Sequence, residues 1–348
     1  KSAALRSSLD RTLRDGIFKV CSWAACINER EGKMARIELL PRAYSSYKAN
    51  LHCHTTYSDG NLSPEQVKEH YKANGYSVVA FTDHNVLIDH SALNDKDFLA
   101  LVGLEVDTDS FLYGKKHEFN QTCHLCAILR NPAHAVPVYR AERYTAEAIS
   151  AKIDEFHQNG YIVNYNHPTW SCEGADEFLH YGLFDGMEIF NYSAEVANNN
   201  GYSHGEYALA LRLMNHRIRC IAADDNHDGY DCEADSCGGW VVFKAPELSY
   251  EAIIKAYDDM RFYSSTGPEI KQCYIEDGVF VLDCSPVRRV HLMTQGIDPV
   301  YCGYSPENDL THIEIDISKV PDTARFLWLQ LTDGVGHKAW MNPYYLKD

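Results

Sequence analysis

Short, continuously apolar runs separated by helical patterns fill the middle of the sequence. Runs without polar alternation are typical of strands whose two faces are both buried. Seven runs fit this description: Tyr47–Cys53, Ser77–Thr82, Leu99–Val106, His124–Leu129, Tyr161–Tyr165, Gly186–Phe190 and Arg219–Ala223. Strand and helix signals alternate from about residue 48 to residue 268, which predicts a parallel sheet or a barrel of about seven strands.

Helix signals occupy the segments between these runs. Ser63-Pro64-Glu65-Gln66 combines an N-cap serine, a proline at the first helical position and a capping-box glutamine. This helix is expected to end near Asn74-Gly75. Further helices are predicted over Thr145–His157, Glu206–Asn215 and Ser249–Met260.

After Gly267-Pro268 the pattern changes to short strands with no long helix between them. The predicted strands are Gln272–Ile275, Val279–Asp283, Arg289–Met293, His312–Ile317 and Phe326–Leu331. Turn signals such as Glu276-Asp277-Gly278 separate them, as in an antiparallel β domain. We therefore predict an N-terminal extension over residues 1–47, with no role assigned to residues 1–33, an α/β domain over 48–270 and a small β domain over 271–348.

Composition and charge narrow the class of protein. The chain has 348 residues, of which 45% are hydrophobic and 23% charged, as in ordinary globular proteins. No apolar run approaches the length that spans a membrane. The formal charge of −17 argues against non-specific binding of DNA or RNA. A small anionic substrate in a locally positive pocket remains compatible with this charge.

Twelve irregularly spaced cysteines and the absence of a secretory pattern at the start predict a cytoplasmic protein with reduced, mostly buried thiols. A redox role for Cys123-x-x-Cys126 remains an alternative. Met34 precedes the first regular stretch and is a candidate native start.

The most informative feature is the position of histidine and carboxylate residues relative to the predicted strands. They stand at the strand ends, in Leu51-His52-Cys53-His54, Ser58-Asp59-Gly60, Thr82-Asp83-His84-Asn85, Gly103-Leu104-Glu105, His124, Asn166-His167-Pro168 and Asp224-Asp225-Asn226-His227. In a βα barrel the carboxyl ends of the strands converge on one mouth. The pattern therefore predicts that these side chains meet at one rim.

His52 and His54 alone are weak evidence, because two histidines on one face of a strand can equally be hydrogen-bonded core residues. Five separate segments that deliver ligand-type side chains to one rim are not explained in this way. We interpret the set as a metal centre.

These motifs resemble the polymerase and histidinol phosphatase (PHP) family. The resemblance is carried by His52-Cys53-His54-Thr55 with Ser58-Asp59-Gly60, by Thr82-Asp83-His84-Asn85, by Gly103-x-Glu105, and by His124, His167-Pro168 and Asp225-x-His227 in that order. A second resemblance, over residues 261–268 and 336–343, is to a PHP subgroup with a C-terminal β domain that includes carbaryl hydrolase.

The family resemblance implies a distorted seven-stranded (β/α) barrel with two or three divalent metal ions. The first ion would be held by His52, His54, Glu105 and Asp225, the second by Glu105, His124 and His167, and the third by Asp59, His84 and His227. Some family members have histidine where this chain has Asp59. Glu105, Asp225 and His227 are also the expected catalytic residues.

Imidazole and carboxylate ligands suit zinc, iron or manganese. Two ions about 3.5–4 Å apart can share a hydroxide that attacks an ester bond. With three ions the formal charges leave a positive excess that matches a phosphate dianion, whereas with two ions they cancel. The expected function is therefore a phosphoesterase for a small phosphate ester or nucleotide. The alternatives are hydrolysis of a neutral carbamate, amide or ester, and a non-catalytic structural metal site.

Supporting roles fall to neighbouring residues. Asp83 and Asp224 are candidates to accept a hydrogen bond from a ligand histidine. Arg143 is the candidate to bind substrate phosphate, with Arg130 as the alternative. Further candidates at the pocket are Tyr165, Asn191 and Tyr192, and Asp228 is either a turn residue or a general acid. The sequence leaves the oligomeric state open.

Overall fold

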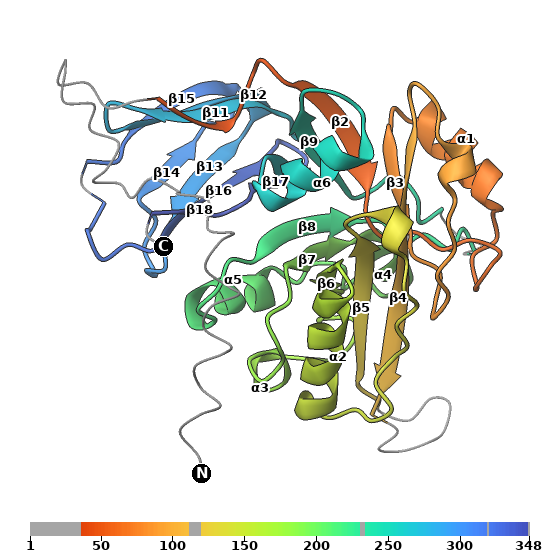
Figure 1. Cartoon of the computed structure of the whole chain (residues 1–348). Coiled ribbons are helices and arrows are strands. Elements are labelled where there is room, and N and C mark those ends of the chain that lie inside the picture. The colour runs from red at the N-terminus through yellow and green to blue at the C-terminus, as the bar shows by residue number, and fades with distance from the viewer. Residues whose placement is uncertain (1–35, 111–119, 230–233, 319, 347–348) are drawn as a thin grey trace, which may run out of the picture.

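The computed structural model describes residues 36–110, 120–229, 234–318 and 320–346, so the segment 1–33 lies outside the described residues. The chain forms a mixed α/β part, which carries α1 to α6, and a C-terminal β part (Figure 1). Fourteen strands belong to one large sheet, whose order is β14-β13-β16-β17-β10-β9-β2-β3-β4-β5-β6-β7-β8, with β18 paired to β16.

Each of the seven apolar runs coincides with a strand of this sheet. The strands are β2 (Ser45–Asn50), β3 (Val78–Phe81), β4 (Leu99–Asp109), β5 (Thr122–Leu129), β6 (Tyr161–Tyr165), β7 (Gly186–Asn191) and β8 (Arg219–Ala223). β6 and β8 have the predicted bounds. β2 ends at Asn50, earlier than predicted, so His52 and His54 follow the strand instead of lying within it.

The direction of β5 corrects the prediction of an all-parallel arrangement. β2, β3 and β4 are parallel, as are β6, β7 and β8, but β5 is antiparallel to both β4 and β6. The amino end of β5 therefore lies at the same rim as the carboxyl ends of its neighbours. This explains why His124 lies near the start of its strand, whereas Glu105 lies in the second half of β4 and the other candidate ligands follow the carboxyl ends of their strands.

A closed seven-stranded barrel is not confirmed, because the backbone ladder among the described residues is an open path that ends at β8. Side chains satisfy the outer edge of β8 in place of another strand. The Ser264 hydroxyl accepts from the Ala222 N–H (2.9 Å) and donates to the Cys220 carbonyl (2.7 Å), and Asn342 Oδ1 accepts from the Cys220 N–H (2.8 Å).

The four predicted helices are present as α1 (Pro64–Ala73), α2 (Ala146–Gln158), α5 (His204–Leu213) and α6 (Tyr250–Asp258). The capping box of α1 forms as predicted, since Ser63 Oγ accepts from the Gln66 N–H and Gln66 Oε1 accepts from the Ser63 N–H. Two short helices were not predicted, α3 (Ala175–Phe178) and α4 (Tyr192–Asn198).

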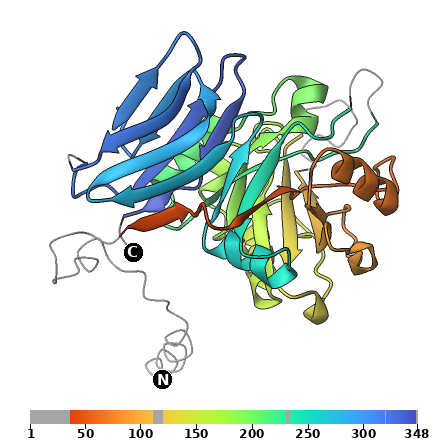
Figure 2. The same cartoon turned by 90° about the horizontal axis from the view of Figure 1, so that it is seen from above.

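The C-terminal part is a β sandwich. One layer is β1 (Ile37–Leu40), β11 (Ile270–Glu276), β12 (Val279–Val287) and β15 (Leu310–Asp316). The other layer contains β13 (Arg289–Met293), β14 (Tyr301–Tyr304), β16 (Phe326–Thr332), β17 (Lys338–Met341) and β18 (Tyr344–Tyr345). Both layers contribute to one core, for example through Phe280 and Leu329. Figure 2 shows strand β1 beside the blue C-terminal strands, so the first and the last described strands both belong to this sandwich.

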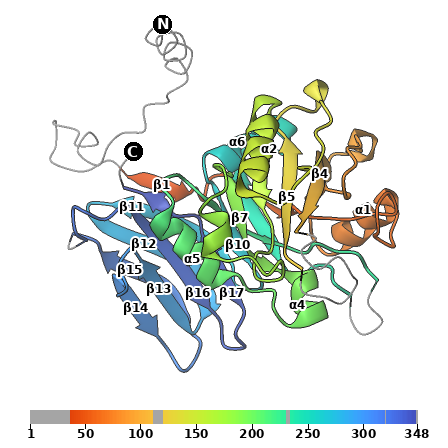
Figure 3. The same cartoon turned by 90° about the horizontal axis from the view of Figure 1, so that it is seen from below.

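Two strands not predicted from the sequence, β9 (Trp240–Ala245) and β10 (Phe262–Ser265), connect β2 to β17 and make the large sheet continuous. Buried Trp328 and Trp340 of the C-terminal part belong to the same core cluster as Tyr207 of α5. Figure 3 shows α5 beside β16, with α1 on the far side of the molecule. The two parts are therefore joined by both backbone pairing and apolar packing.

Candidate metal centre

The predicted ligands converge on one rim of the mixed sheet. Backbone pairing fixes their positions, because Cys53 bridges Asn226 and His84 bridges Glu105 in parallel fashion. The segments that follow β2 and β8 thereby lie side by side, although they are far apart in sequence. The Asp225 N–H also donates to the His52 carbonyl (3.0 Å). Backbone contacts beyond the strand ends, and not adjacency in the strand order, therefore bring these two segments together.

Glu105 of β4 lies at the centre of the cluster and is fully buried. Its carboxylate oxygens lie 3.0–3.5 Å from ring nitrogens of five imidazoles, those of His52, His54, His84, His124 and His167. His124 and His167 both approach Oε1, at 3.0 and 3.5 Å. The Asn166 side-chain amide also donates to Oε1 (2.7 Å). One carboxylate therefore connects side chains from four strand ends.

Asp225 forms a second centre beside Glu105. Its Oδ1 lies 3.0 Å from His52 Nε2 and 2.9 Å from His54 Nε2, and those two nitrogens are 3.1 Å apart. Oδ2 lies 3.8 Å from His167 Nε2. Two imidazole nitrogens and a carboxylate oxygen thus face a single point, as in a metal ligand set.

Asp59, His84 and His227 surround the outer side of His54. Asp59 Oδ1 lies 3.5 Å from His227 Nε2 and 3.7 Å from His54 Nδ1, and Oδ2 lies 3.8 Å from His84 Nε2. The side chain of Asp59 is 57% exposed, so this outer group faces solvent. Gly60 allows the loop to fold closely here, because a Cβ at this position would lie 2.6 Å from the His54 carbonyl.

The atoms of the cluster itself fit divalent metal ions. Glu105 Oε2 and His84 Nδ1 are buried without a hydrogen-bond partner, although they lie only 3.1 Å apart. Unpaired buried polar atoms are costly, and a cation between such atoms removes the cost. Their lone pairs therefore have the arrangement that a bound cation would require.

Four overlapping groups place their ligand atoms within 4.8 Å of one another: His52/His54/Glu105/Asp225, His54/Asp59/His84/His227, His84/Glu105/His124 and His52/His167/Glu188. The first is the set expected for the first ion, and the second contains the set expected for the third. The set expected for the second ion is divided, because His124 groups with His84 whereas His167 groups with His52 and Glu188. The structure brings all nine residues together, and their role as ligands remains a prediction.

Electrostatic coupling inside the cluster is strong. Burial alone would raise the pKa values of Glu105 and Asp225, but the surrounding imidazoles, His52 first among them, hold both values well below the usual range. Burial would likewise lower the pKa of His227, but Asp59 and Asp225 raise it to about 9. The carboxylates are therefore ionised, and without metal they hold protons on neighbouring imidazoles.

Two candidate ligands are among the described residues with a strained backbone. His167 has φ 23° and Asp225 has φ 56°, in the left-handed region that residues with side chains rarely adopt. The Asp225 hydrogen bond to His52 holds one of them, and the His167 N–H donates to Glu188 Oε2 (2.9 Å) at the other. Strain of this kind is found where surrounding structure imposes a functional orientation.

Glu188 of β7 is a site residue that the sequence analysis missed. It is buried, and its Oε1 accepts from His52 Nδ1 (2.8 Å). Because a carboxylate only accepts, this bond places the His52 proton on Nδ1 and leaves Nε2 toward the cluster. Asn191 donates to both Glu188 (2.9 Å) and Asp225 (3.1 Å), in line with its predicted place at the pocket. The sequence signal that could have identified it is a single glutamate within the apolar run Gly186–Phe190.

Asp83 and Asp224 need a correction, because the hydrogen bonds described for them do not go to a ligand histidine. Asp83 accepts from the Thr55 N–H (2.7 Å) and from Ser58 Oγ (2.9 Å), and so shapes the loop that carries Asp59. Asp224 accepts from Tyr71 and from the N–H groups of residues 237–239. Both act on the loops around the cluster, and Glu188 takes the predicted role of a carboxylate that orients a ligand histidine.

The two predicted phosphate-binding arginines do not reach the cluster in this structure. Arg143 is exposed, and none of the described cluster contacts includes it. Arg130 follows the carboxyl end of β5, opposite His124, and binds Asp258 (2.5 Å). Arg140, which was not predicted, has a described link to the rim. It binds Asp107 (2.8 Å), the residue that pairs with His124 in the β4–β5 ladder.

The structure also shows the contacts of the remaining candidate pocket residues and of the cysteines. Tyr165 is buried and donates to Glu173 (2.6 Å), and the ring of Tyr192 lies against the backbone of Gly238. Asp228 has φ 51° and accepts from Ser236 (2.7 Å), which matches its interpretation as a turn residue. None of the nine described cysteines forms a disulfide bond, and Cys123 and Cys126 are among them.

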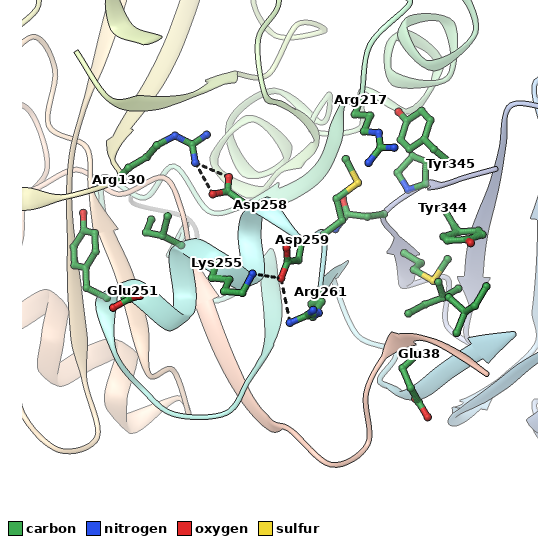
Figure 4. A pocket seen from close by; sticks show the side chains of 18 of the residues that line it. Glu38, Arg130, Arg217, Glu251, Lys255, Asp258, Asp259, Arg261, Tyr344 and Tyr345 are labelled. Atoms are coloured by element: carbon green, nitrogen blue, oxygen red, sulfur yellow. Dashed lines mark hydrogen bonds and ion pairs between the residues drawn. The ribbon is translucent and has the colours of Figure 1, made fainter. Parts of the chain in front are cut away.

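A cavity of about 1030 Å³ lies at the opposite end of the strands, between α6 and the C-terminal part. Figure 4 shows ion pairs among its charged side chains, which join Arg130 to Asp258 and both Lys255 and Arg261 to Asp259. No histidine lines this cavity, so the candidate metal centre is the cluster at the rim.

No helix among the described residues is long and apolar enough to cross a bilayer.

Comparison with known proteins agrees with this geometry. Residues 50–211 match the family model of the PHP domain. This chain carries a PHP domain. The matched segment contains seven of the nine candidate ligands, and Asp225 and His227, which lie beyond it, join the same cluster in the structure. The comparisons do not confirm the resemblance to the carbaryl hydrolase subgroup, and a search of curated proteins finds no match.

Solved structures with a similar arrangement share little sequence with this PHP-domain chain. One is a two-domain protein containing a predicted PHP-like metal-dependent phosphoesterase from Bacteroides vulgatus, with 15% identity, a TM-score of 0.43, and coverage of 84% of this chain and 93% of that one. Another is an amidohydrolase from Chromobacterium violaceum with bound sulfate and no metal, with 14% identity, a TM-score of 0.32, and coverage of 49% and 84%. These overlaps are too small to carry a functional argument.

Proposed function

We propose that this PHP-domain chain is a metal-dependent phosphoesterase that cleaves a small phosphate ester. The observation that carries the proposal is the convergence of six imidazoles and four carboxylates, Glu105 and Asp225 at their centre, with ligand atoms within 4.8 Å of one another in overlapping groups. A closed, four-coordinate structural site needs far fewer ligands and usually more cysteine. The excess of ligand atoms and the exposed outer group around Asp59 support an open, catalytic site.

Divalent ions bound there supply Lewis-acid stabilisation of the negative charge that develops on a phosphoryl group. The protein itself prepares the donor atoms. Glu188 fixes the Nδ1 proton of His52, and the Asp225 carbonyl accepts from His227 Nδ1 (2.8 Å), so the Nε2 atom of each imidazole is directed to the cluster. Asn166 and Asn191 hold the Glu105 and Asp225 carboxylates in fixed orientations.

A cationic side chain near the cluster bears on the charge of the substrate. Arg140 pairs with Asp107 (2.8 Å), whose backbone faces His124 in the β4–β5 ladder, and its side chain is about half exposed, so a guanidinium lies near the rim. Arginine pairs with phosphate oxygens in a bidentate manner. This neighbour favours an anionic phosphate over a neutral carbamate or ester.

The proposal is tested on protein purified without chelator. Metal per chain is measured by elemental mass spectrometry, and turnover is measured with 4-nitrophenyl phosphate and 4-nitrophenyl acetate. We expect bound divalent metal, phosphate release, and loss of both in Glu105→Gln, whereas His312→Gln in the C-terminal domain retains both. Metal-loaded protein that cleaves the acetate but not the phosphate overturns the proposal in favour of a neutral substrate. Unfolding on metal removal, without turnover of either ester, overturns it in favour of a structural site.

A further inference from the structure

A large aromatic side chain lies at the edge of the metal cluster without a role in it. Trp170 is 38% exposed. Its ring meets His167 edge-on at 4.9 Å between centroids and His124 at 5.6 Å. Both imidazoles contact the same Glu105 oxygen. Trp170 therefore contacts two of the imidazoles that surround Glu105, and its side chain is still accessible to solvent.

The loop that carries Trp170 is tightly held. The Ser171 N–H donates to the His167 carbonyl (3.0 Å), and the Glu173 N–H donates to the Pro168 carbonyl (3.0 Å). Cys172 adopts φ 58°, which turns the chain sharply after the tryptophan. A loop with these bonds presents its side chain in one place, so little conformational entropy is lost when a ligand contacts it.

A buried carboxylate anchors the end of this loop. Glu173 is 3% exposed and accepts hydroxyl hydrogen bonds from Tyr144 (2.5 Å), Tyr165 (2.6 Å) and Tyr181. These tyrosines come from segments on both sides of the loop. Glu173 and the three tyrosine hydroxyls thus hold the end of a short loop whose exposed aromatic side chain is Trp170, as in a positioned binding surface.

We propose that Trp170 is a specificity-determining residue that contacts the planar aromatic group of a phosphate monoester held at the metal cluster. The inference rests on the proposed function and adds the substrate class, an ester of an aromatic alcohol or a similar planar group. An exposed indole offers a large, rigid face, and stacking on such a face is tolerant of the identity of the ring. Arg140 and the cluster would hold the phosphate end of the same molecule.

The test compares phenyl phosphate with glycerol phosphate, which carries the same phosphate on a non-planar alcohol. Trp170→Ala is expected to lower kcat/KM for phenyl phosphate about 5- to 100-fold, mainly through KM, and to change glycerol phosphate turnover less than about twofold. Trp170→Phe restores most of the loss. Tyr304→Ala, which removes an exposed aromatic ring of the C-terminal domain, leaves both substrates unchanged. An equal loss on the two substrates overturns the inference, because it shows a structural role alone.

Binding without turnover separates this inference from the proposed function. Phenylphosphonate and methylphosphonate are titrated into the metal-loaded protein by calorimetry, since neither contains a cleavable ester. Tighter binding of phenylphosphonate that disappears in Trp170→Ala supports the inference even if no phosphate ester is cleaved. Equal affinity of the wild-type protein for both phosphonates overturns it, whatever the turnover.

Discussion

Metal binding to the metal-free protein should displace a proton from His227. Asp59 and Asp225 raise the pKa of this imidazole to about 9 against the effect of burial. At pH 7.5 about 97% of His227 would then be protonated. An imidazole must be neutral to bind an ion, so an ion that uses His227 has to release this proton. The apparent metal affinity should therefore rise with pH until about 9.

The size of the effect follows from the distance between pH and pKa. Each unit below the pKa weakens the apparent affinity tenfold, so at pH 7.5 the proton on His227 costs about 2 kcal/mol. The side chain is only 23% exposed, so solvent screening leaves most of this figure intact. Carboxylate neighbours also raise the pKa values of His52, His54 and His124, which makes the wild-type dependence steeper than one proton.

The assay is calorimetric titration of chelator-treated protein with Mn²⁺ at pH 6.5, 7.5 and 8.5, under anaerobic conditions. Repeating it in buffers of different ionisation enthalpy counts the protons released. His227→Gln should release about one proton fewer and show a correspondingly shallower pH dependence. His312→Gln removes an exposed imidazole paired with Asp283 in the C-terminal domain and should behave as wild type. Equal proton release by wild type and His227→Gln would refute the reasoning.

Two further predictions concern the surroundings of the cluster. Burial raises the pKa of Glu173 to about 7, so the native state favours the protonated form, and stability should fall by up to about 3 kcal/mol as pH rises from about 4.5 to 7. Urea unfolding at pH 5 and pH 8 should show a smaller fall for Glu173→Gln than for wild type, and parallel curves would contradict this. Arg140→Met should raise KM for phenyl phosphate about tenfold, whereas the exposed Arg143→Met should change it less than twofold. Steady-state kinetics of the two variants decides the point, and equal effects would remove Arg140 from the site.

Local signals were sufficient for much of the fold. Apolar runs marked β6 and β8 to the residue, and the Ser63 capping box marked the start of α1. Such signals are local, because burial on both faces and capping of free N–H groups depend on neighbouring residues. β9 and β10 were not predicted, although Trp240–Ala245 contains a local apolar run, and their places between β2 and β17 are set by pairing with remote strands.

The candidate site divides in the same way. Residue type and position near strand ends were enough to predict a metal centre, and the resemblance to the PHP family then implied its nine ligands, from His52 to His227. Glu188 was missed because a carboxylate in a buried strand has no local signature of the histidine that it orients. Trp170 and Arg140 were missed because exposure beside a cluster becomes visible only when His124 and His167 are placed.

The sequence by itself determined which segments become strands and which side chains can bind a cation, because both depend on residue chemistry and short-range pattern. Only the tertiary structure decided that β5 runs against its neighbours, that side chains of Ser264 and Asn342 cover the edge of β8, and that Glu105 lies among five imidazoles. An apolar run predicts a buried strand but not whether that strand lies parallel or antiparallel to its neighbours. Strand direction and partners are therefore chosen by contacts between residues far apart in the chain.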